Sequence, residues 1–188
     1  MNFSLVVPVI CAIWVLSEIL LAVFRRSGRT QSPLDKSSLR IIWATIILAV
    51  PGGVYVGKQS IGHISPGESV LPWIGLLLIL SGIGIRWWAV VSLGKYFTVD
   101  VAIRDDHKVV KSGLYRHVRH PIYAGSLLSF FGLGLTFPNI LSILIIFVPI
   151  CAAFVYRITV EEQALIETFG DEYINYCKTT KRLIPGVY

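Results

Sequence analysis

Charged residues are scarce in this sequence: only 15% of its 188 residues are Asp, Glu, Lys or Arg, whereas 54% are hydrophobic. A typical soluble domain carries about 25% charged residues, and the mean hydropathy here is +0.69. The scarcity of charge therefore argues against a soluble globular domain and indicates a membrane protein. The charges that are present give a formal net charge of +6. Membrane proteins acquire such an excess by keeping Lys and Arg in cytosolic loops, so we expect no nucleic-acid partner.

Cysteine is also rare, and the three that occur, Cys11, Cys151 and Cys177, are far apart in the sequence. Two of them lie within apolar runs, where a thiol is usually buried and inert. This pattern indicates neither a disulfide framework nor a zinc site, and we expect no bound metal.

Signals for cleavage after export and for dinucleotide binding are missing as well. The first apolar stretch, residues 5–24, has no basic segment before it and no small-residue cleavage site, so we interpret it as a membrane anchor. The Gly-x-Gly pairs at Gly82 and Gly84 and at Gly132 and Gly134 lie inside apolar runs and not after a strand. A dinucleotide site of the Rossmann type is therefore not supported.

Long apolar stretches are what the sequence has in abundance. A helix rises 1.5 Å per residue, so about 20 apolar residues cross the hydrocarbon core of a bilayer. The apolar stretches are residues 5–24, 39–56, 71–91 and 124–157. The last is too long for one span and is divided by Pro138-Asn139, so it predicts a hairpin of two membrane helices.

These stretches predict an all-α fold, a single membrane-embedded helical bundle of about five transmembrane helices. Residues 1–91 would form three of them, and residues 92–188 a second, more polar half with the hairpin and a C-terminal cytosolic segment. In that last segment, four residues recur at helical spacing: Leu165, Phe169, Tyr173 and Cys177. The spacing predicts an amphipathic tail against the bundle, interrupted at Gly170.

The distribution of basic residues predicts the orientation. Five of them crowd the first connection: Arg25, Arg26, Arg29, Lys36 and Arg40. The second connection, residues 57–70, carries only Lys58, His63 and Glu68 as ionisable residues. By the positive-inside rule the first connection is cytosolic and the N-terminus lies outside. With five spans, residues 92–120 and 159–188 also lie in the cytosol.

One dense group of polar residues precedes the fourth span, in residues 107–123. Pro121 suits the first position of a helix, whose free backbone N–H groups would then face the cytosol and attract an anion. Arg119 or His120 could help to hold a carboxylate or phosphate there. The alternative is that these basic residues and Arg116 only contact lipid headgroups.

A second polar group, Arg157, Glu161 and Glu162, lies at the cytosolic end of the fifth span. Arg157 and Glu161 are four residues apart, so they share a helix face and could form an ion pair. Arg157 could instead hold an anionic substrate while Glu161 accepts a ribose hydroxyl or an ammonium group. Two other ionisable residues lie within apolar runs: we expect Arg86 to snorkel beside its tryptophans and Glu18 to be structural.

The two polar groups resemble motifs of one enzyme family. The first motif runs Gly113-Leu-Tyr115, then Arg119-His120-Pro121-Ile-Tyr123-Ala-Gly125. The second runs Glu161-Glu162, Leu165-Ile166, Phe169-Gly170-Asp-Glu-Tyr173, Tyr176 and Arg182-Leu-Ile-Pro185. Together they resemble the isoprenylcysteine carboxyl methyltransferases and the related phospholipid methyltransferases. The motifs cover about the C-terminal half, and the first three spans add only topology.

The resemblance implies a membrane enzyme with a cytosolic pocket for S-adenosylmethionine and a lipid-like acceptor that enters from the bilayer. The implied cofactor-binding residues are Asp100, His107, Lys108, Val109, Val110, Tyr115, His120, Pro121, Ile122, Tyr123 and Glu161. Asp100 is the nearest match to a polar residue, commonly Gln, that the family has upstream of the histidine. Arg157 matches the position that holds the acceptor, and we expect Arg157, Glu161 and Arg119 to take part in catalysis.

The sequence leaves several acceptors open. A basic residue at Arg157 favours an anionic acceptor, so the first hypothesis is methylation of the α-carboxylate of a prenylated cysteine or of a similar acid. N-methylation of an aminophospholipid is the second, and another hydrophobic thiol or acid is a third. The contrasting hypothesis is a membrane protein without enzymatic activity whose basic loops bind membrane lipids.

Overall fold

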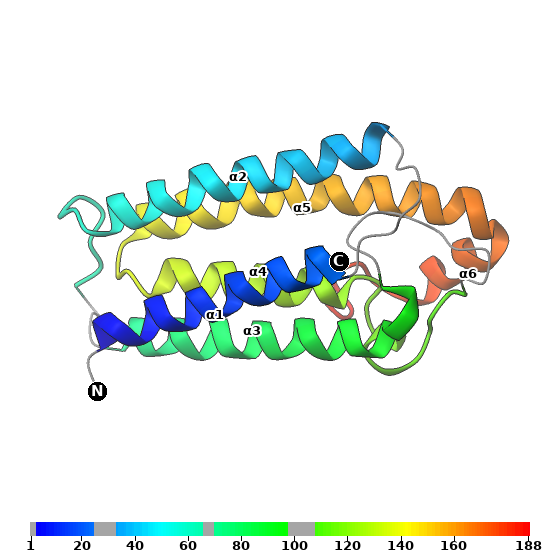
Figure 1. The fold of residues 1–188 in the computed structure, drawn as a ribbon, viewed down its shortest axis with the longest axis horizontal. Coiled ribbons are helices and arrows are strands. Elements are labelled where there is room, and N and C mark those ends of the chain that lie inside the picture. Colours follow the sequence, from blue (N-terminus) through cyan, green and yellow to red (C-terminus); the bar gives the residue numbers. More distant parts are fainter. Residues whose placement is uncertain (1–2, 25–32, 66–69, 98–107) are drawn as a thin grey trace.

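The computed structural model describes residues 3–24, 33–65, 70–97 and 108–188, and all regular elements in these ranges are helical. The α-helices are α1 (Phe3–Phe24), α2 (Pro33–Gly57), α3 (Leu71–Leu93), α4 (Pro121–Leu135), α5 (Ile140–Phe169) and α6 (Asp171–Thr179). Two short 3-10 helices, η1 (Gly94–Tyr96) and η2 (Gly113–Arg116), flank the connection between α3 and α4. Figure 1 shows α1 to α5 running along one long axis. The predicted all-α membrane bundle is confirmed.

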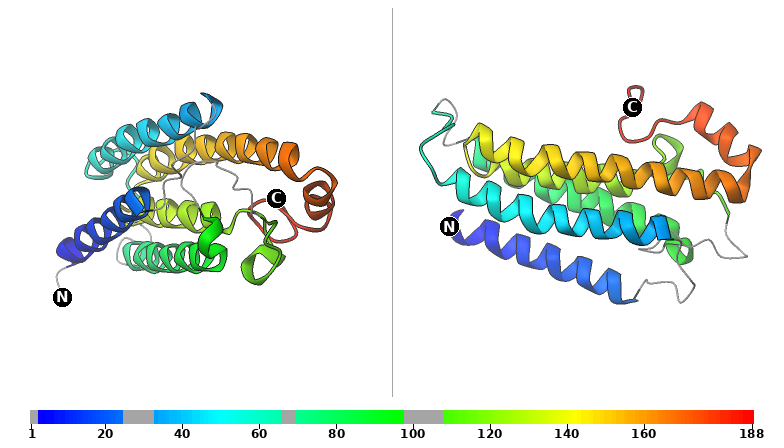
Figure 2. Two further views of the ribbon diagram at one scale, coloured as in Figure 1. Left: turned by 45° about the vertical axis from the view of Figure 1, so that its right-hand side comes forward. Right: turned by 90° about the horizontal axis from the view of Figure 1, so that it is seen from above.

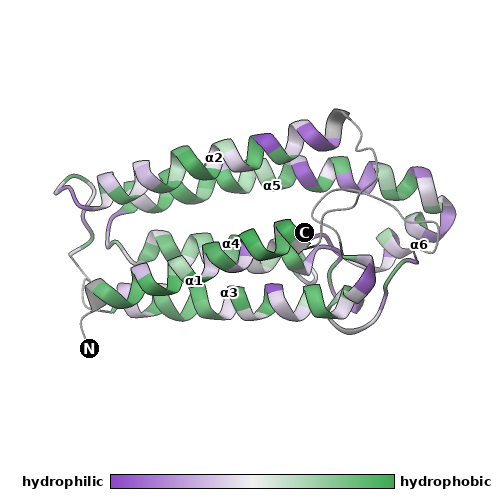
Figure 3. Ribbon diagram, in the orientation of Figure 1, coloured by the Kyte–Doolittle hydropathy of each residue, from purple (hydrophilic) through white to green (hydrophobic). Residues whose placement is uncertain are grey.

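Three of the described helices are long and apolar enough to cross a membrane: Asp35–Gly57, Leu71–Tyr96 and Ile140–Phe169. The other two apolar helices, Leu5–Leu21 and Pro121–Leu135, are shorter. Five apolar helices thus match the expected bundle of about five. In Figure 3 hydrophobic residues dominate the length of these helices, and hydrophilic residues gather in the connections and around α6.

The helices pack as two antiparallel pairs, α3 with α4 and α2 with α5, and the pairs meet through α4 and α5. Figure 2 shows both pairs, with α1 on one face of the arrangement. The α3–α4 contact is close because glycines face each other: a Cβ on Gly125 would lie 2.6 Å from the carbonyl oxygen of Gly82. Only glycine permits that approach of two backbones.

The predicted hairpin between α4 and α5 is confirmed, and Asn139 explains why the chain turns there. Its side-chain oxygen accepts hydrogen bonds from the backbone N–H groups of Leu141 (2.9 Å) and Ser142 (3.2 Å) and so caps α5. Its amide donates to the carbonyl of Ile61 at 2.8 Å. This buried residue therefore starts α5 and fixes the connection that follows α2.

The predicted interruption at Gly170 is also confirmed. Helix α5 continues beyond Arg157 to Phe169, and Gly170 ends it with a φ of 52°, a left-handed conformation that favours glycine. Helix α6 then turns back toward the segment before α4. In Figure 1 the last turn of α1, the start of α2, η2 and α6 lie at the same end of the bundle. The sequence predicted that these segments lie on one side of the membrane, and their position at one end of the bundle agrees with this. That this side is the cytosol stays a prediction.

Candidate active site

A cavity of about 490 Å³ extends from residues of α6 to residues of α1, α2 and α4. This volume is within the range of small-molecule sites, about 300 to 1,000 Å³. The sequence-predicted residues that line it are Lys108, Val109, Val110, Tyr115, Arg119, His120, Ile122, Tyr123, Arg157 and Glu161. Pro121 is buried at the first position of α4, as predicted. Two other predicted residues, Asp100 and His107, lie outside the described residues.

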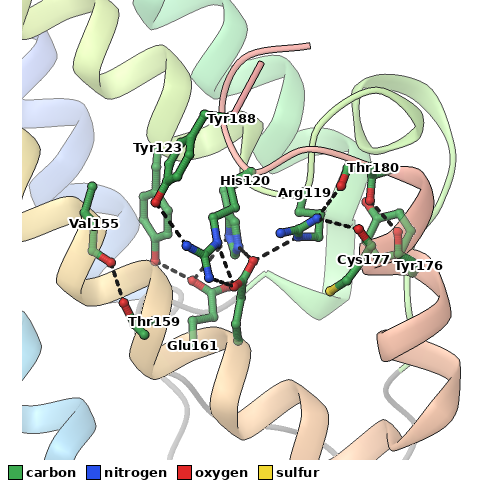
Figure 4. Close-up of polar contacts among 12 residues, drawn as sticks. Arg119, His120, Tyr123, Val155, Thr159, Glu161, Tyr176, Cys177, Thr180 and Tyr188 are labelled. Atoms are coloured by element: carbon green, nitrogen blue, oxygen red, sulfur yellow. Dashed lines mark hydrogen bonds and ion pairs between the residues drawn. The ribbon is translucent and has the colours of Figure 1, made fainter. Parts of the chain in front are cut away.

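The polar part of the cavity is built around the start of α4. His120 is the N-cap residue and its side chain makes no capping hydrogen bond, so the ring is directed elsewhere. It stacks on Tyr123, with the ring centroids 5.7 Å apart and the planes 20° from parallel. The Tyr123 hydroxyl donates to Oε2 of Glu161 at 2.7 Å, as Figure 4 shows. Residues from the two predicted motifs therefore meet.

Glu162, the neighbour of Glu161, joins three basic side chains. Its Oε1 accepts from Nε of Arg119 at 2.9 Å and lies 3.2 Å from Nε2 of His120. Its Oε2 lies 2.7 Å from Nη2 of Arg182. The Arg119 guanidinium also donates to the backbone carbonyls of Cys177 and Thr180. Glu162 is only 6% exposed, so these contacts lie in a region of low dielectric.

The same network fixes the C-terminal tail onto the segment before α4. The backbone N–H groups of Arg119 and His120 donate to the carbonyls of Lys181 (2.8 Å) and Arg182 (3.0 Å). The tail thus passes directly beside the site (Figure 4). The sequence indicated Arg119 and His120, but the contact of Arg182 with Glu162 was missed because Arg182 lies twenty residues away, in the tail that follows α6.

Arg157 is 1% exposed and forms an ion pair with Asp35 in the first turn of α2. Its Nη1 also donates to the Ser38 hydroxyl at 2.6 Å. The sequence suggested Glu161 on the same helix face as one possible partner, and Glu161 accepts the hydrogen bond of Tyr123. Asp35 was missed because an acidic residue at a helix start is usually explained by the helix dipole. Nothing in the sequence singles Asp35 out, because it stands beside Lys36 in a polar first turn of the helix.

The expected snorkelling of Arg86 is wrong. Its guanidinium points into the bundle, where it forms an ion pair with Glu18 of α1 and donates from Nη1 to the Ser126 hydroxyl at 3.2 Å. Both charged residues line the cavity. An ionisable group at membrane depth is costly unless it is paired, and here each residue satisfies the other. The interpretation of Glu18 as structural agrees with this pair.

Two tyrosines outside the membrane helices close the polar end. Tyr115 is 5% exposed, and its hydroxyl donates to the carbonyl of Ala89 at 3.4 Å. Tyr176 of α6 donates to the backbone carbonyl of Tyr115. Burial raises the pKa of Tyr115, and the Glu161 carboxylate raises it further. Burial also raises the pKa of Tyr176, to about 12. Both phenols are therefore neutral near pH 7.

These residues fit S-adenosylmethionine as a ligand. The free N–H groups at the start of α4 suit a carboxylate, and the Glu161 carboxylate suits a hydroxyl or an ammonium group. The tyrosine rings suit an adenine face or a sulfonium. Within the described part of the chain, no group of three His, Cys, Asp or Glu is arranged to hold a metal ion.

The sequence and the structure were compared with known proteins. Residues 73–167 match the model of the isoprenylcysteine carboxyl methyltransferase (ICMT) family. The protein-S-isoprenylcysteine O-methyltransferase B of Arabidopsis thaliana is 33% identical over 127 residues, which are 65% of this chain and 64% of that protein. The protein-S-isoprenylcysteine O-methyltransferase of Saccharomyces cerevisiae is 38% identical over 105 residues, 55% of this chain and 44% of that protein.

A solved structure has a similar fold. The eukaryotic intramembrane Ras methyltransferase ICMT matches with a TM-score of 0.55 and 23% sequence identity, over 85% of this chain and 55% of that one. This likeness and the apolar helices identify the chain as a helical integral membrane protein. A probable protein-S-isoprenylcysteine O-methyltransferase of Oryza sativa subsp. indica is 34% identical over 117 residues, 61% of this chain and 61% of that protein. The chain thus spans somewhat less than two thirds of the length of the Arabidopsis and Oryza proteins.

Proposed function

The chain belongs to the isoprenylcysteine carboxyl methyltransferase family, and from this premise we propose that it is a methyltransferase that uses S-adenosylmethionine. Its acceptor is the α-carboxylate of a prenylated cysteine or of a similar lipid-like acid. One observation carries the proposal: a single cavity connects the polar group around Tyr123 and Glu161 with apolar side chains of α1, α2 and α4. A cofactor and a lipid chain can therefore occupy the same cavity from its two ends.

The cofactor is assigned to the polar end. We propose contacts from Tyr115, His120, Tyr123 and Glu161, together with residues 108–110 and, before them, Asp100 and His107. When bound, S-adenosylmethionine supplies an electrophilic methyl group on a positively charged sulfur. The residues of the chain orient the two reactants and exclude water, which is where most of the acceleration of a bimolecular transfer arises.

Arg157 is assigned to the acceptor. A carboxylate is already ionised near pH 7, so this reaction needs no general base, but the charge has to be held in apolar surroundings. The contacts of Arg157 with Asp35 and Ser38 fix the direction of the guanidinium where it lines the cavity. For Arg119 we propose a positioning role, because its guanidinium contacts Glu162 and the carbonyls of the tail.

N-methylation of an aminophospholipid is the second candidate, and the carboxylates of Glu18 and Glu161 in the cavity favour it. An amine has to lose a proton before it attacks, and Glu161 is the acidic group at the polar end that could accept one. For either acceptor we propose that the α6 end faces the cytosol, because α2 begins toward that end with the basic residues Lys36 and Arg40. The surrounding lipids supply the acceptor or the path by which it arrives.

The cofactor assignment can be tested without knowing the acceptor. We would titrate detergent-purified protein with S-adenosylhomocysteine by calorimetry, using wild type, His120→Ala, Glu161→Ala and the control Glu167→Ala. Glu167 lies on the same helix and is exposed. Wild type and the control should bind, and the two site variants should bind about ten-fold or more weakly, as expected for loss of a hydrogen bond to a charged group. Absence of binding by folded wild type would reject the methyltransferase and favour a lipid-binding protein.

A further inference from the structure

Helix α1 contributes one wall of the apolar part of the cavity. Four of the residues that it presents recur every three or four positions: Val7, Cys11, Trp14 and Glu18. Most of its other large side chains are exposed, such as Ile13 at 63% and Leu16 at 56%. One face of α1 therefore lines the cavity while the rest faces outward, and the size of the cavity depends on that face.

Trp14 is the largest side chain on this wall, and it is fixed on two sides. Its ring lies against Phe130 of α4, with the centroids 4.8 Å apart and the planes at 52°. Its indole Nε1 donates to Oε1 of Glu18 at 3.2 Å. The ring is 7% exposed although it lines a cavity. An aromatic ring that packs against a second ring and is hydrogen-bonded through its N–H group has little freedom to move aside.

The Glu18 carboxylate that holds the indole is itself held. It forms the ion pair with Arg86, and Arg86 donates to Ser126 of α4 at 3.2 Å. Side chains of α1, α3 and α4 are thus connected at this level. The position of the Trp14 ring is therefore determined by contacts with α4 and, through Glu18, with α3.

Trp14 lies between the polar end of the cavity and its distal, apolar part. At 1.5 Å per residue, Trp14 lies about 6 Å from the level of Glu18 and about 10 Å from the level of Val7. The polar group lies on the Glu18 side. Beyond Trp14 the cavity is lined by apolar residues such as Cys11, Leu133 and Phe137. A chain whose head group reaches the polar end has to pass the Trp14 ring in order to enter this distal part.

We propose that Trp14 is the residue that determines which acceptor chain length the protein prefers. This inference rests on the proposed methyltransferase function and assigns the specificity of the same site. The fixed ring limits the space available to the distal end of a prenyl chain, and Glu18 and Arg86 act as positioning residues that keep it there. Removing the ring widens the passage from the polar end to the distal part of the cavity and admits longer chains.

The test is a comparison of three acceptors of increasing length: cysteine derivatives that carry a geranyl, a farnesyl or a geranylgeranyl group. We would measure kcat/KM for each with wild type, Trp14→Ala, Trp14→Leu and Trp14→Phe. Trp88→Ala is the matched control, because Trp88 on α3 is 59% exposed and does not line the cavity. Binding of S-adenosylhomocysteine identifies the variants that keep a folded cofactor site.

In Trp14→Ala, the ratio of kcat/KM for the geranylgeranyl compound to that for the geranyl compound should rise about ten-fold or more, a typical effect of altered space in an apolar pocket. Trp14→Leu should shift the ratio in the same direction, which keeps the inference testable if the alanine variant does not fold. Trp14→Phe keeps a ring and should retain most of the wild-type preference, and Trp88→Ala should retain all of it.

An unchanged ratio in Trp14→Ala or Trp14→Leu that still binds S-adenosylhomocysteine overturns the inference and leaves the proposed function intact. An equal loss with all three acceptors has the same meaning, because it shows a structural role alone. Wild type that binds S-adenosylhomocysteine but methylates none of the three overturns the proposed carboxyl methylation and this inference with it.

Discussion

Arg157 near the end of the membrane part of α5 is ion-paired with Asp35 in the first turn of α2, although 122 residues separate them in the sequence. Both side chains are almost completely buried. The pair links the second and fifth membrane helices at the level of the site. It also provides a fixed cation in a wall of the cavity, which is what an acidic acceptor requires.

Replacing Asp35 with Ala should destabilise the protein, because it leaves the charge of Arg157 buried without its carboxylate partner. Breaking a buried pair in this way typically costs about 3 to 5 kcal/mol. Thermal unfolding in detergent measures the loss, and Lys36→Ala is the control because the neighbouring Lys36 is exposed. Equal stability of Asp35→Ala and Lys36→Ala would contradict the importance of the pair.

Glu162→Gln should loosen the C-terminal tail. The substitution keeps the shape of the side chain but removes the charge that Arg119 and Arg182 contact. Hydrogen exchange should become faster at the backbone N–H groups of Arg119 and His120, which donate to the tail. Affinity for S-adenosylhomocysteine should fall with it. Glu167→Gln is the control, because Glu167 is exposed on the same helix, and it should change neither the exchange rate nor the affinity. Exchange as slow in Glu162→Gln as in wild type would show that the tail is held by other contacts.

Folding stability should fall as the pH rises above about 10, the pKa of an ordinary phenol. The pKa of Tyr176 is raised to about 12 in the folded protein, so the unfolded chain loses this proton first. A raised folded-state pKa gives stability that is complete below pH 10 and is lost as the pH increases through 12. Tyr176→Phe should therefore show a smaller decrease in Tm between pH 9 and pH 11 than wild type does.

The control for this pH dependence is Tyr55→Phe, since Tyr55 is 70% exposed. Its Tm should follow the wild-type curve. Tyr176→Phe should also be less stable than wild type at neutral pH, because the hydroxyl no longer donates to the carbonyl of Tyr115. Identical pH curves for wild type and Tyr176→Phe would show that Tyr176 ionises equally easily in both states.

Glu18 and Arg86 should be energetically coupled. Each single change, Glu18→Ala or Arg86→Ala, leaves one charge at membrane depth and should cost about 3 to 5 kcal/mol. The double variant leaves no unpaired charge, so its loss should be clearly smaller than the sum of the two single losses. The three values come from unfolding of matched samples in one detergent. Additive losses would mean that the two side chains do not depend on each other.

The sequence predicted the helices well because their signals are local. Apolar runs gave the membrane helices, Pro138-Asn139 gave the hairpin, and Gly170 gave the end of α5. Likewise, ten of the candidate residues line the same cavity, because short motifs keep them together on the ends of two helices. Their chemical roles remain proposals.

The pairings between distant helices could not be predicted in this way. Arg86 was expected to reach the membrane surface because its neighbours are tryptophans, yet its partner is Glu18 on another helix. For Arg157 the only partner considered was Glu161, four residues away on the same helix, and Asp35 was missed. In both cases the spacing along one helix carries no information about which side chain a second helix brings opposite.

The central claim is methyl transfer to a carboxylate, and the nature of the product tests it most directly. Purified wild type would be incubated with S-adenosylmethionine that carries a labelled methyl group and with two acceptors, N-acetyl-S-farnesylcysteine and phosphatidylethanolamine. Carboxyl methylation gives a methyl ester, so the account predicts label in the farnesylcysteine that alkali releases as methanol. Label that stays on the phospholipid amine after alkali, or no transfer by protein that binds S-adenosylhomocysteine, would contradict it.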